Sequence, residues 1–533
     1  MKHVETHGID WRSLGTAAAE RFSGKARMEL EGNRQVWTVD CEPDRLRDAA
    51  LWLTGELGYS FGTLVVEQFA ANWRLTYLFY EPNGQGWVDL IVGFAEENEM
   101  VPSISDIVYA ADWEEREAED LFGLHFSGHP KLGEFVLHEH WPEGVNPMRR
   151  EFAAAQKAPI ERSPASLYPS TILEAPGAMA LPVGPVFSDF AESAEYVLET
   201  TGEEMIRVAP RFFYKYRAVE KIAEGRKAED VLLLAERFSG SSAFAHGLGF
   251  CRAVEGVSQI AVPRRAAQLR SLFAEVERVR HHTAHIAAIC GSTGLDVAQA
   301  QAAILEEELL RLSCEFAGHR YLFGLNCLGG ITLDLDRRAI DEVSNRIVDI
   351  GKRLLALQDG LRFSSSFLDR IEEVGIVSAE NARAFNLVGP VGRASGRAGD
   401  FRLLFRYAAY DGLHIQVPTE EEGDGYARLR ILFREASESI RLIRELASSM
   451  SAGEVRAAVE PKAGVGLGAV EAPIGAALHW VRLDEEGRVS RYRLATPSFR
   501  NWLAFRIALE GFGFQDFPII LATFGLSNAE CDR

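Results

Sequence analysis

The chain has 533 residues, of which 47% are hydrophobic and 25% are charged, and its formal net charge is −20. This length and balance are typical of a soluble globular protein with more than one domain. The acidic excess argues against a nucleic-acid partner and against adsorption to anionic lipid.

The first part of the chain, residues 1–150, predicts an α+β domain. Runs rich in β-branched and aromatic residues predict strands at RQVWTVD, TLVVEQFA, WRLTYLFYE and WVDLIVGFA. Between the first two, PDRLRDAALWLTGEL predicts a helix with Pro43 at its start. Successive strands after one helix favour an α+β arrangement over a regular alternation of strands and helices.

Residues 151–183 predict a proline-rich linker, with prolines at 159, 164, 169, 176 and 182. Such a density of proline favours an extended connection over a packed element. We expect limited proteolysis to cut first between about Glu151 and Pro182 and to separate the two halves.

The remaining residues, 184–533, predict a mainly α-helical bundle domain. The segment 266–289 places its apolar residues on one stripe, as an amphipathic helix does. Similar stripes run through AQAAILEEELLRLSCEFAGHRYLF, RRAIDEVSNRIVDIGKRLLAL and YARLRILFREASESIRLIRELASSM. Four long amphipathic helices are typical of a bundle. A short strand pair with a turn at Glu486 and Gly487 is expected near the end.

Neither a signal peptide nor a membrane span is predicted. The N-terminus has no apolar core, and the most apolar run, Phe517 to Leu526, is too short to cross a bilayer. We therefore expect a cytoplasmic protein that reaches the membrane only through a partner. No two of the six cysteines form a CxxC pair, so we expect no Fe–S cluster on this chain.

Two segments resemble known families. WEEREAEDLFGLHFSGHP, Trp113 to Pro130, resembles the signature of the C subunit of bacterial complex I. From about Gly202 onward the chain resembles the D subunit of complex I and, more closely, the large subunits of membrane-bound, energy-converting [NiFe] hydrogenases. In formate hydrogenlyase these two halves are fused in this order. The resemblance implies a fused C/D-type subunit whose second half has the hydrogenase large-subunit fold.

The resemblance of the second half rests on a series of motifs in family order. They are FFYKYRAVEK (212–221), Glu277 and Arg278 with His282, GHR (318–320), LGG (328–330), GPVGRASGRAGDFR (389–402), GDGYAR (423–428), VEAP (470–473) and TPSFRNW (496–502).

The positions that hold nickel in the family differ here. The first cysteine pair falls on Ser239 and Ser242, and the second on Ser527 and Glu530. Ile474 also stands where the family has an arginine. Soft metals need thiolates, and a serine hydroxyl is a hard, poor donor. The resemblance thus implies that the four vacated positions converge and that the nickel–iron centre is absent. The tyrosine and histidine of the complex I quinone site fall near Gly240 and Phe187, so neither is present.

Three residues are candidates for catalysis: Glu236, His246 and Asp400. His246 either handles a proton in the vacated cavity or is a core histidine. Glu236 either begins a proton path or forms a buried ion pair with Arg237, and the ion pair is favoured. Asp400 belongs with Arg393 and Arg402 to a charged network, for which proton transfer and structural pairing remain open alternatives.

One further pair has the spacing of metal ligands. His281 and His285 are four residues apart, as in zinc-binding helices, but no third ligand is in view. A structural role is therefore favoured for both.

The resemblance implies a subunit of a membrane-attached, complex I-like oxidoreductase complex that is not itself a hydrogenase. The expected partners are a small Fe–S subunit, which carries the clusters, and integral-membrane subunits of the complex I type, with the chain on the cytoplasmic face of the inner membrane. The alternative is a catalytically empty scaffold or conformational relay in such a complex.

Overall fold

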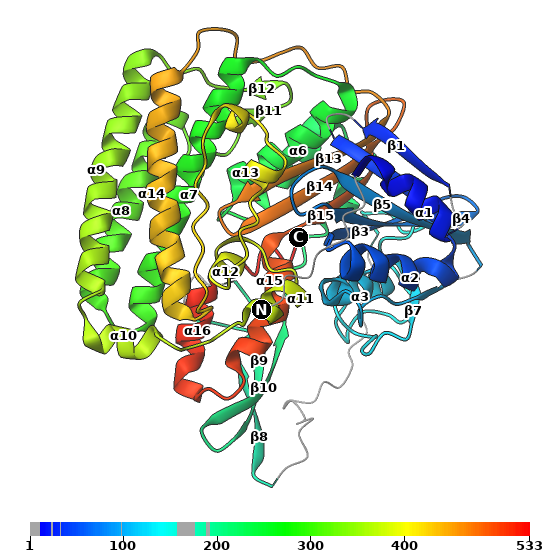
Figure 1. Ribbon diagram of the computed structural model, residues 1–533, viewed down its shortest axis with the longest axis horizontal. Helices are drawn as coiled ribbons and strands as arrows, with labels where there is room; N and C mark the ends of the chain where they lie inside the picture. Colours follow the sequence, from blue (N-terminus) through cyan, green and yellow to red (C-terminus); the bar gives the residue numbers. More distant parts are fainter. Residues whose placement is uncertain (1–10, 23–24, 32–33, 98, 157–175, 188–191) are drawn as a thin grey trace.

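The computed structural model describes residues 11–22, 25–31, 34–97, 99–156, 176–187 and 192–533. Figure 1 shows an N-terminal part built on a sheet, a set of long helices on the opposite side, and a smaller sheet between them. The prediction of mixed α and β structure is confirmed.

The N-terminal part is built on a five-stranded sheet in the order β1-β2-β5-β4-β3. Its strands are β1 (Ala26–Glu31), β2 (Arg34–Cys41), β3 (Ser60–Gln68), β4 (Asn72–Tyr80) and β5 (Trp87–Ala95). Only β2 and β5 pair in parallel; the other neighbours are antiparallel. The four predicted strands are confirmed. The predicted helix is also confirmed, as a 3-10 turn (Pro43–Arg45), α2 (Leu46–Leu51) and a π-helical turn (Trp52–Glu56).

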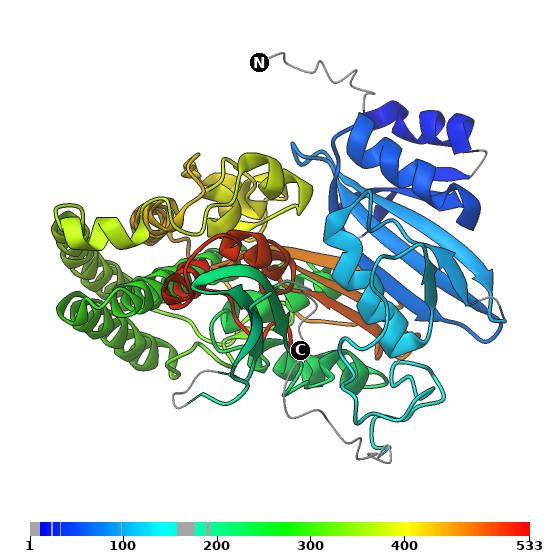
Figure 2. The same ribbon diagram turned by 90° about the horizontal axis from the view of Figure 1, so that it is seen from below.

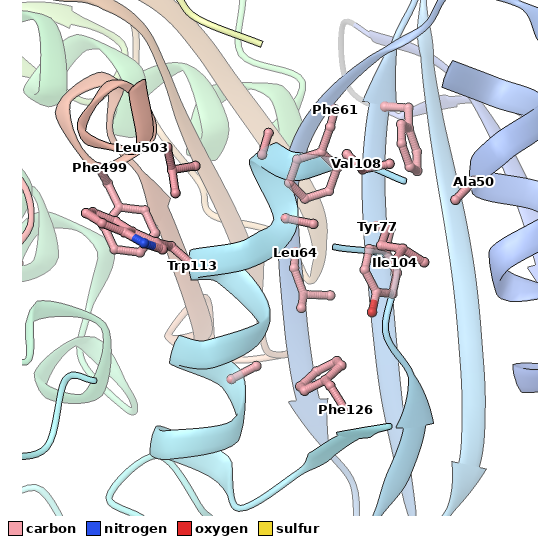
Figure 3. Close-up of a cluster of buried hydrophobic side chains, with 14 of the residues drawn as sticks. Ala50, Phe61, Leu64, Tyr77, Ile104, Val108, Trp113, Phe126, Phe499 and Leu503 are labelled. Carbon is pink, nitrogen blue, oxygen red and sulfur yellow. The ribbon is translucent and has the colours of Figure 1, made fainter. Parts of the chain in front are cut away.

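The signature segment forms a buried helix, α3 (Asp112–Phe122), which ends at Gly123 in the left-handed conformation that glycine adopts at little cost. Its Trp113 lies against Phe499 of α15 (Pro497–Leu509), with ring centroids 5.4 Å apart (Figure 3). The smaller elements of this part are the 3-10 turns Trp11–Ser13 and Tyr109–Ala111, α1 (Leu14–Phe22), β6 (Met100–Pro102) and β7 (His125–Ser127).

Four long helices form the predicted bundle. They are α7 (Arg264–Ser292), α8 (Asp296–Ala317), α9 (Arg337–Leu361) and α14 (Gly425–Ser449). Figures 1 and 2 show them side by side, with α7 packed against α8 and α14. The apolar stripe of α7 is buried as expected, and 22 of its residues are buried in all.

Short elements connect the longer ones in this half. They are α4 (Val219–Ala223), β11 (Asn326–Cys327), β12 (Gly330–Ile331), α10 (Ser365–Ile371), α11 (Ala379–Ala384), α12 (Gly389–Arg393), α13 (Phe401–Leu404) and the 3-10 turns Tyr410–Gly412 and Phe514–Asp516.

The strand pair predicted near the end is in fact part of a three-stranded sheet, β13-β14-β15. β14 (Gly475–Leu483) and β15 (Val489–Ala495) were expected, whereas β13 (Gly464–Ala472) was not, because its glycines lower strand propensity. Those glycines allow helix α6 (Ala243–Ser258) to pack closely against β13. A Cβ on Gly466 would lie 2.3 Å from the Ala253 carbonyl oxygen.

The end of the predicted linker needs a correction. β8 (Ala178–Val183) lies inside the range 151–183, yet it pairs antiparallel with β9 (Glu195–Thr201), which pairs in turn with β10 (Glu204–Arg211). An edge strand can include proline where no ladder hydrogen bond is needed, so Pro182 does not prevent the pairing. The stretch 157–175 of the predicted linker lies outside the described residues.

The two parts of the chain share one hydrophobic core. A single cluster of buried residues includes Trp73 and Phe122 from the N-terminal part and Trp502 from α15. Arg493 of β15 also forms buried ion pairs with Glu114 and Glu117 of α3. A shared core argues against halves that separate once the connection is cut. None of the described helices combines the length and apolarity that a bilayer crossing requires.

Candidate functional site

The four positions that the resemblance assigns to a metal lie in one polar cluster, in which Ser239, Ser242 and Glu530 are buried and Ser527 is half-buried. Ser239 and Ser242 follow α5 (Ala228–Arg237), and Ser527 and Glu530 follow α16 (Phe517–Phe524). Although 288 positions separate them, the hydroxyl oxygens of Ser239 and Ser527 are 3.5 Å apart. Ser527 and Glu530 are also connected through Ser498, whose hydroxyl accepts from the Ser527 backbone N–H and whose own N–H donates to Glu530. The donors of this cluster are hydroxyls and one carboxylate, without a thiol from these positions.

One hydroxyl of this cluster is left without a partner. Ser242 Oγ is buried and makes no hydrogen bond to any described residue. A buried polar group in that state costs on the order of 1–3 kcal/mol unless water or a ligand satisfies it. Ser239, by contrast, is within hydrogen-bond distance of Ser241, at 2.9 Å. The two buried serines therefore differ, because only the Ser242 hydroxyl lacks a partner among the described residues.

Glu530 is held at the N-terminus of α15. The Ser498 backbone N–H donates to its Oε2 at 3.0 Å, and the positive end of the helix dipole favours a carboxylate there. The other oxygen, Oε1, lies 3.4 Å from His246 Nε2. Both side chains are fully buried.

A chain of titratable groups runs on from Glu530. His246 Nδ1 lies 3.2 Å from His479 Nε2, and His479 Nδ1 lies 2.7 Å from the Tyr492 hydroxyl. Burial and the neighbouring His246 hold the pKa of His479 well below its usual value. Burial raises the pKa of Tyr492, and Glu220 adds to the effect. Glu530, His246, His479 and Tyr492 therefore form one buried hydrogen-bonded chain, along which a proton can move by small shifts.

Glu236 lies beside this cluster but is held by other contacts. Its two oxygens accept from the Gly324 backbone N–H at 3.1 and 3.0 Å. Arg237 Nε donates to Oε1 at 3.2 Å, while the arginine side chain reaches the surface. These contacts fit the buried ion pair better than the start of a proton path.

Asp400 belongs to a second buried network. It pairs with Arg402 at 2.7 Å and faces Arg393 at 3.6 Å. Burial alone would raise the pKa of Asp400, but Arg402 and then Arg393 hold it below its usual value. Arg402 also pairs with Glu275 at 3.0 Å. Asp400 is thus ionised and paired, which favours a structural role for this residue.

Arg393 is the centre of the second network. It pairs with Glu435 at 2.5 Å and with Glu471 at 2.9 Å. Arg393 holds the pKa of the buried Glu435 well below its usual value, and the His282 ring supports this from 2.9 Å. Burial and the charge of Asp400 instead raise the pKa of Glu471 to about 7. Among the carboxylates of this network, Glu471 is therefore the one that titrates near neutral pH.

The histidines with zinc spacing hold no metal-ligand arrangement. His285 Nε2 lies 2.7 Å from the Ala522 carbonyl oxygen, and burial lowers its pKa to about 4. His281 is also buried, 3.5 Å from His282. No group of three potential ligands that could hold a metal occurs in the described residues. The contact of His285 with the Ala522 carbonyl supports a structural role for that residue.

Sequence reasoning missed His479, Tyr492, Glu275 and Glu435. The first two lie on neighbouring strands that were expected only as a short pair. The alternation along β14 was a usable signal, because it places His479 on the face covered by α6.

Comparisons with known proteins match both parts of the chain. Residues 39–158 match the family model of the respiratory-chain NADH dehydrogenase 30 Kd subunit. Residues 300–465 and 455–533 match the model of the respiratory-chain NADH dehydrogenase 49 Kd subunit. Residues 217–310 match the model of nickel-dependent hydrogenase, in the stretch that contains Ser239 and Ser242.

Similar proteins contain both parts in one chain. Formate hydrogenlyase subunit 5 of Escherichia coli (strain K12) is 29% identical over 86% of this chain and 81% of its own length. Hydrogenase-4 component G of the same strain is 27% identical over 84% of this chain and 78% of its own length. The fused C/D subunit of NADH-quinone oxidoreductase from Bdellovibrio bacteriovorus is 25% identical over 82% and 84%.

Proposed function

Since the chain is a fused C/D-type subunit, with a 30-kDa-type and a 49-kDa-type domain in one polypeptide, we propose that it is a core subunit of a membrane-attached, complex I-like oxidoreductase complex. The similarity to a formate hydrogenlyase subunit over 86% of the chain carries this proposal. In it, electrons arrive on the clusters of a small Fe–S subunit, and integral-membrane subunits hold the assembly at the cytoplasmic face of the inner membrane.

The nickel–iron centre of the related hydrogenases does not fit the residues present. Ser239, Ser242 and Ser527 offer neutral hydroxyls, and Glu530 offers one carboxylate that is already bonded to Ser498. Nickel and a low-valent iron select thiolates. We therefore propose that this chain is not itself a hydrogenase and binds no cofactor of its own.

This region instead has the groups for moving protons. Glu530, His246, His479 and Tyr492 form an unbroken buried chain. A histidine passes a proton by exchanging its two ring nitrogens between donor and acceptor roles. In the proposed complex, this chain supplies or removes a proton when the Fe–S partner is oxidised or reduced.

A scaffold without chemistry is the second candidate. Two candidate residues are already paired, which favours this function. Glu236 accepts hydrogen bonds from Arg237 and from the Gly324 backbone N–H, and Asp400 forms an ion pair with Arg402. Paired charges in a buried network stiffen a core and fix its geometry. In this second candidate, the bundle transmits movement between the Fe–S subunit and the membrane subunits.

Affinity purification of the tagged chain from native membranes in mild detergent tests the proposal. We expect a small Fe–S protein and integral-membrane proteins of the complex I type to copurify. A chain recovered alone and monomeric contradicts the proposal.

Variants of the purified complex separate the two candidates. His246→Ala should lower turnover without dissociating the complex, and His125→Ala, at an exposed histidine of the N-terminal part, should not. Unchanged turnover in the His246 variant favours the scaffold.

A further inference from the structure

A cavity of about 660 Å³ lies on the seam between the two parts of the chain. One wall comes from the N-terminal part around Tyr59, Phe61 and Val108, and the other from the segment 383–404. That segment contains the motif GPVGRASGRAGDFR, for which the cluster of Ser239 and Glu530 gives no role. Sites for small molecules usually measure about 300–1,000 Å³. The cavity is therefore large enough for a ligand of that kind.

The walls of the cavity are mostly apolar, and they lie close to each other. The Tyr80 and Phe401 rings meet edge to face across the seam, with centroids 5.3 Å apart. Figure 3 shows Phe61 and Val108 together at the end of this part's core. Leu51, which is 52% exposed, also lines the cavity and marks its opening to the surface. The space thus offers an apolar ligand contacts on both sides and a way in.

A cation without a counter-ion lines this apolar space. Arg397 donates to the Ala382 carbonyl at 3.1 Å and to the Asn386 side-chain oxygen at 2.7 Å. Both acceptors are neutral. Among the described residues no carboxylate forms an ion pair with Arg397, whereas Arg393 of the same motif pairs with three. Asn386 in turn donates to the Phe61 carbonyl at 2.6 Å, so the arginine is positioned from both walls.

The electrostatic surroundings of Arg397 make this arrangement costly. Its side chain is half-buried, and burial lowers its pKa; Tyr80 opposes the effect, and Arg500 and Arg383 add to it. A guanidinium that is drawn out of water beside other cations recovers its desolvation cost only when an anion pairs with it. The planar fork of its N–H groups matches a carboxylate or a phosphate.

The cavity's own carboxylate is not available as that anion. Glu471 lines the cavity, but its Oε1 is held by Arg393 at 2.9 Å and its Oε2 by the Phe401 backbone N–H at 3.0 Å. Glu471 is thus engaged with the network beneath the floor of the cavity, and the Arg397 charge remains unmatched.

We propose that this cavity binds a small organic anion with an apolar body, whose carboxylate or phosphate group pairs with Arg397. The apolar body would lie between Phe61 and Phe401, where it contacts both parts of the chain at once. Such a ligand fastens the seam that joins the 30-kDa-type and 49-kDa-type domains. The site goes beyond the proposed function and does not depend on any reaction at the Glu530 cluster.

Calorimetric titration of the purified full-length chain tests the proposal with three probes that share one alkyl chain: decanoate, decyl phosphate and decanol. We expect either anion to bind at least about tenfold more tightly than the neutral alcohol. The tighter of the two anions identifies the headgroup.

Three variants locate the binding. Arg397→Gln should weaken anion binding by about tenfold or more and leave decanol unchanged, and Arg397→Lys should retain part of the preference for anions. Arg406→Gln, a matched change outside the cavity, should have no effect. Gly399→Leu should block all three probes, because Gly399 lines the cavity and a Cβ there meets no heavy atom within 4 Å.

Three results overturn the proposal: no binding of either anion at about 1 mM, equal binding of decanoate to the Arg397→Gln variant, or binding that survives Gly399→Leu. Circular dichroism and thermal unfolding of each variant check that it is folded. If Arg397→Gln does not fold, the comparison of anion with alcohol on the Gly399→Leu and unchanged chains still decides the question.

Discussion

His479 Nε2 lies 3.2 Å from His246 Nδ1, and both imidazole rings are fully buried. One ring must donate and the other accept, so the two tautomers depend on each other. Their outer nitrogens extend this dependence to Tyr492 and Glu530. A change at one end of the chain therefore alters the hydrogen bonding at the other.

Replacing the middle of this chain should lower the stability of the protein. His479→Phe leaves His246 Nδ1 and the Tyr492 hydroxyl without a partner, so we expect a loss of about 1–3 kcal/mol in the free energy of unfolding, measured with urea. Tyr492→Phe removes only the terminal hydroxyl and should cost about 0.5–1.5 kcal/mol. Equal stability of the His479→Phe variant and the unchanged chain would contradict the hydrogen-bonded chain.

Buried histidines should make the protein less stable in mild acid. The pKa of His285 is lowered to about 4, chiefly by burial, and those of His281 and His479 are also lowered. The folded state therefore binds fewer protons than the unfolded state, and the stabilisation is complete above about pH 6.5 and is lost as the pH falls toward 4. His285 alone accounts for up to about 3 kcal/mol.

Unfolding by urea at pH 7, 6 and 5 measures how steeply the free energy of unfolding changes with pH. His285→Gln should flatten it, because the glutamine amide can donate to the Ala522 carbonyl without titrating. A slope that is the same in this variant would show that other groups cause the acid sensitivity.

Glu115 should show the opposite pH dependence. Burial raises its pKa to about 8, although Ser103 and the Ile104 backbone N–H donate to it. Its contribution is complete below about pH 4.5, the unfolded value, and is lost as the pH rises through about 8. Glu115→Gln cannot ionise, so it should raise the free energy of unfolding at pH 8 by a few kcal/mol at most, on the order of 1.4 kcal/mol for each pH unit.

The adjacent residue provides a matched control. Glu114 pairs with Arg493 across the seam, so Glu114→Gln should destabilise the chain at the same pH. Destabilisation by both substitutions would mean that Glu115 is ionised in the folded state.

The ion pairs across the seam should differ in strength according to their burial. Arg493 pairs across the seam with Glu117 at 2.7 Å and within its own part with Glu220 at 3.2 Å, and all three side chains are buried. Arg493→Met leaves buried carboxylates uncompensated and should cost about 3–5 kcal/mol. Arg482 pairs with Glu67 at 2.5 Å with a quarter of its side chain exposed, so Arg482→Met should cost less, about 1 kcal/mol. Similar losses in urea unfolding would contradict this ranking.

Introducing two thiols should create affinity for a soft metal. Two sulfurs on a tetrahedral ion lie about 3.8 Å apart, close to the 3.5 Å between the hydroxyls of Ser239 and Ser527. The double variant Ser239→Cys/Ser527→Cys should bind one Cd²⁺ and show thiolate charge-transfer absorbance, whereas each single variant binds it weakly. If the pair binds no better than the single variants, the two positions do not meet in solution.

The strongest sequence signals were the longest ones. The periodic stripe in 266–289 identified α7, and runs rich in β-branched and aromatic residues identified β2, β3, β4 and β5. β13 was missed for the opposite reason, since its glycines serve a close approach of α6 and leave no apolar pattern. β8 was missed because Pro182 suggested a linker, although an edge strand can include it.

Only part of the candidate functional site could be predicted from the sequence. Ser239, Ser242, Ser527 and Glu530 could be grouped because the resemblance assigns them to one metal site. His246 and His479 lie 233 positions apart, and nothing local joins them. The pKa of Glu471 depends on its burial and on Asp400, so it follows only from the folded arrangement.

Because the two parts share one core, the peptide connection is not what holds them together. Trp113 meets Phe499, and Arg493 meets Glu117, through contacts that need no covalent link. A chain nicked within 157–175 should therefore stay together through gel filtration and come apart only in denaturant. The continuous polypeptide instead fixes the stoichiometry. Every assembly that contains this chain receives one 30-kDa-type unit for each 49-kDa-type unit.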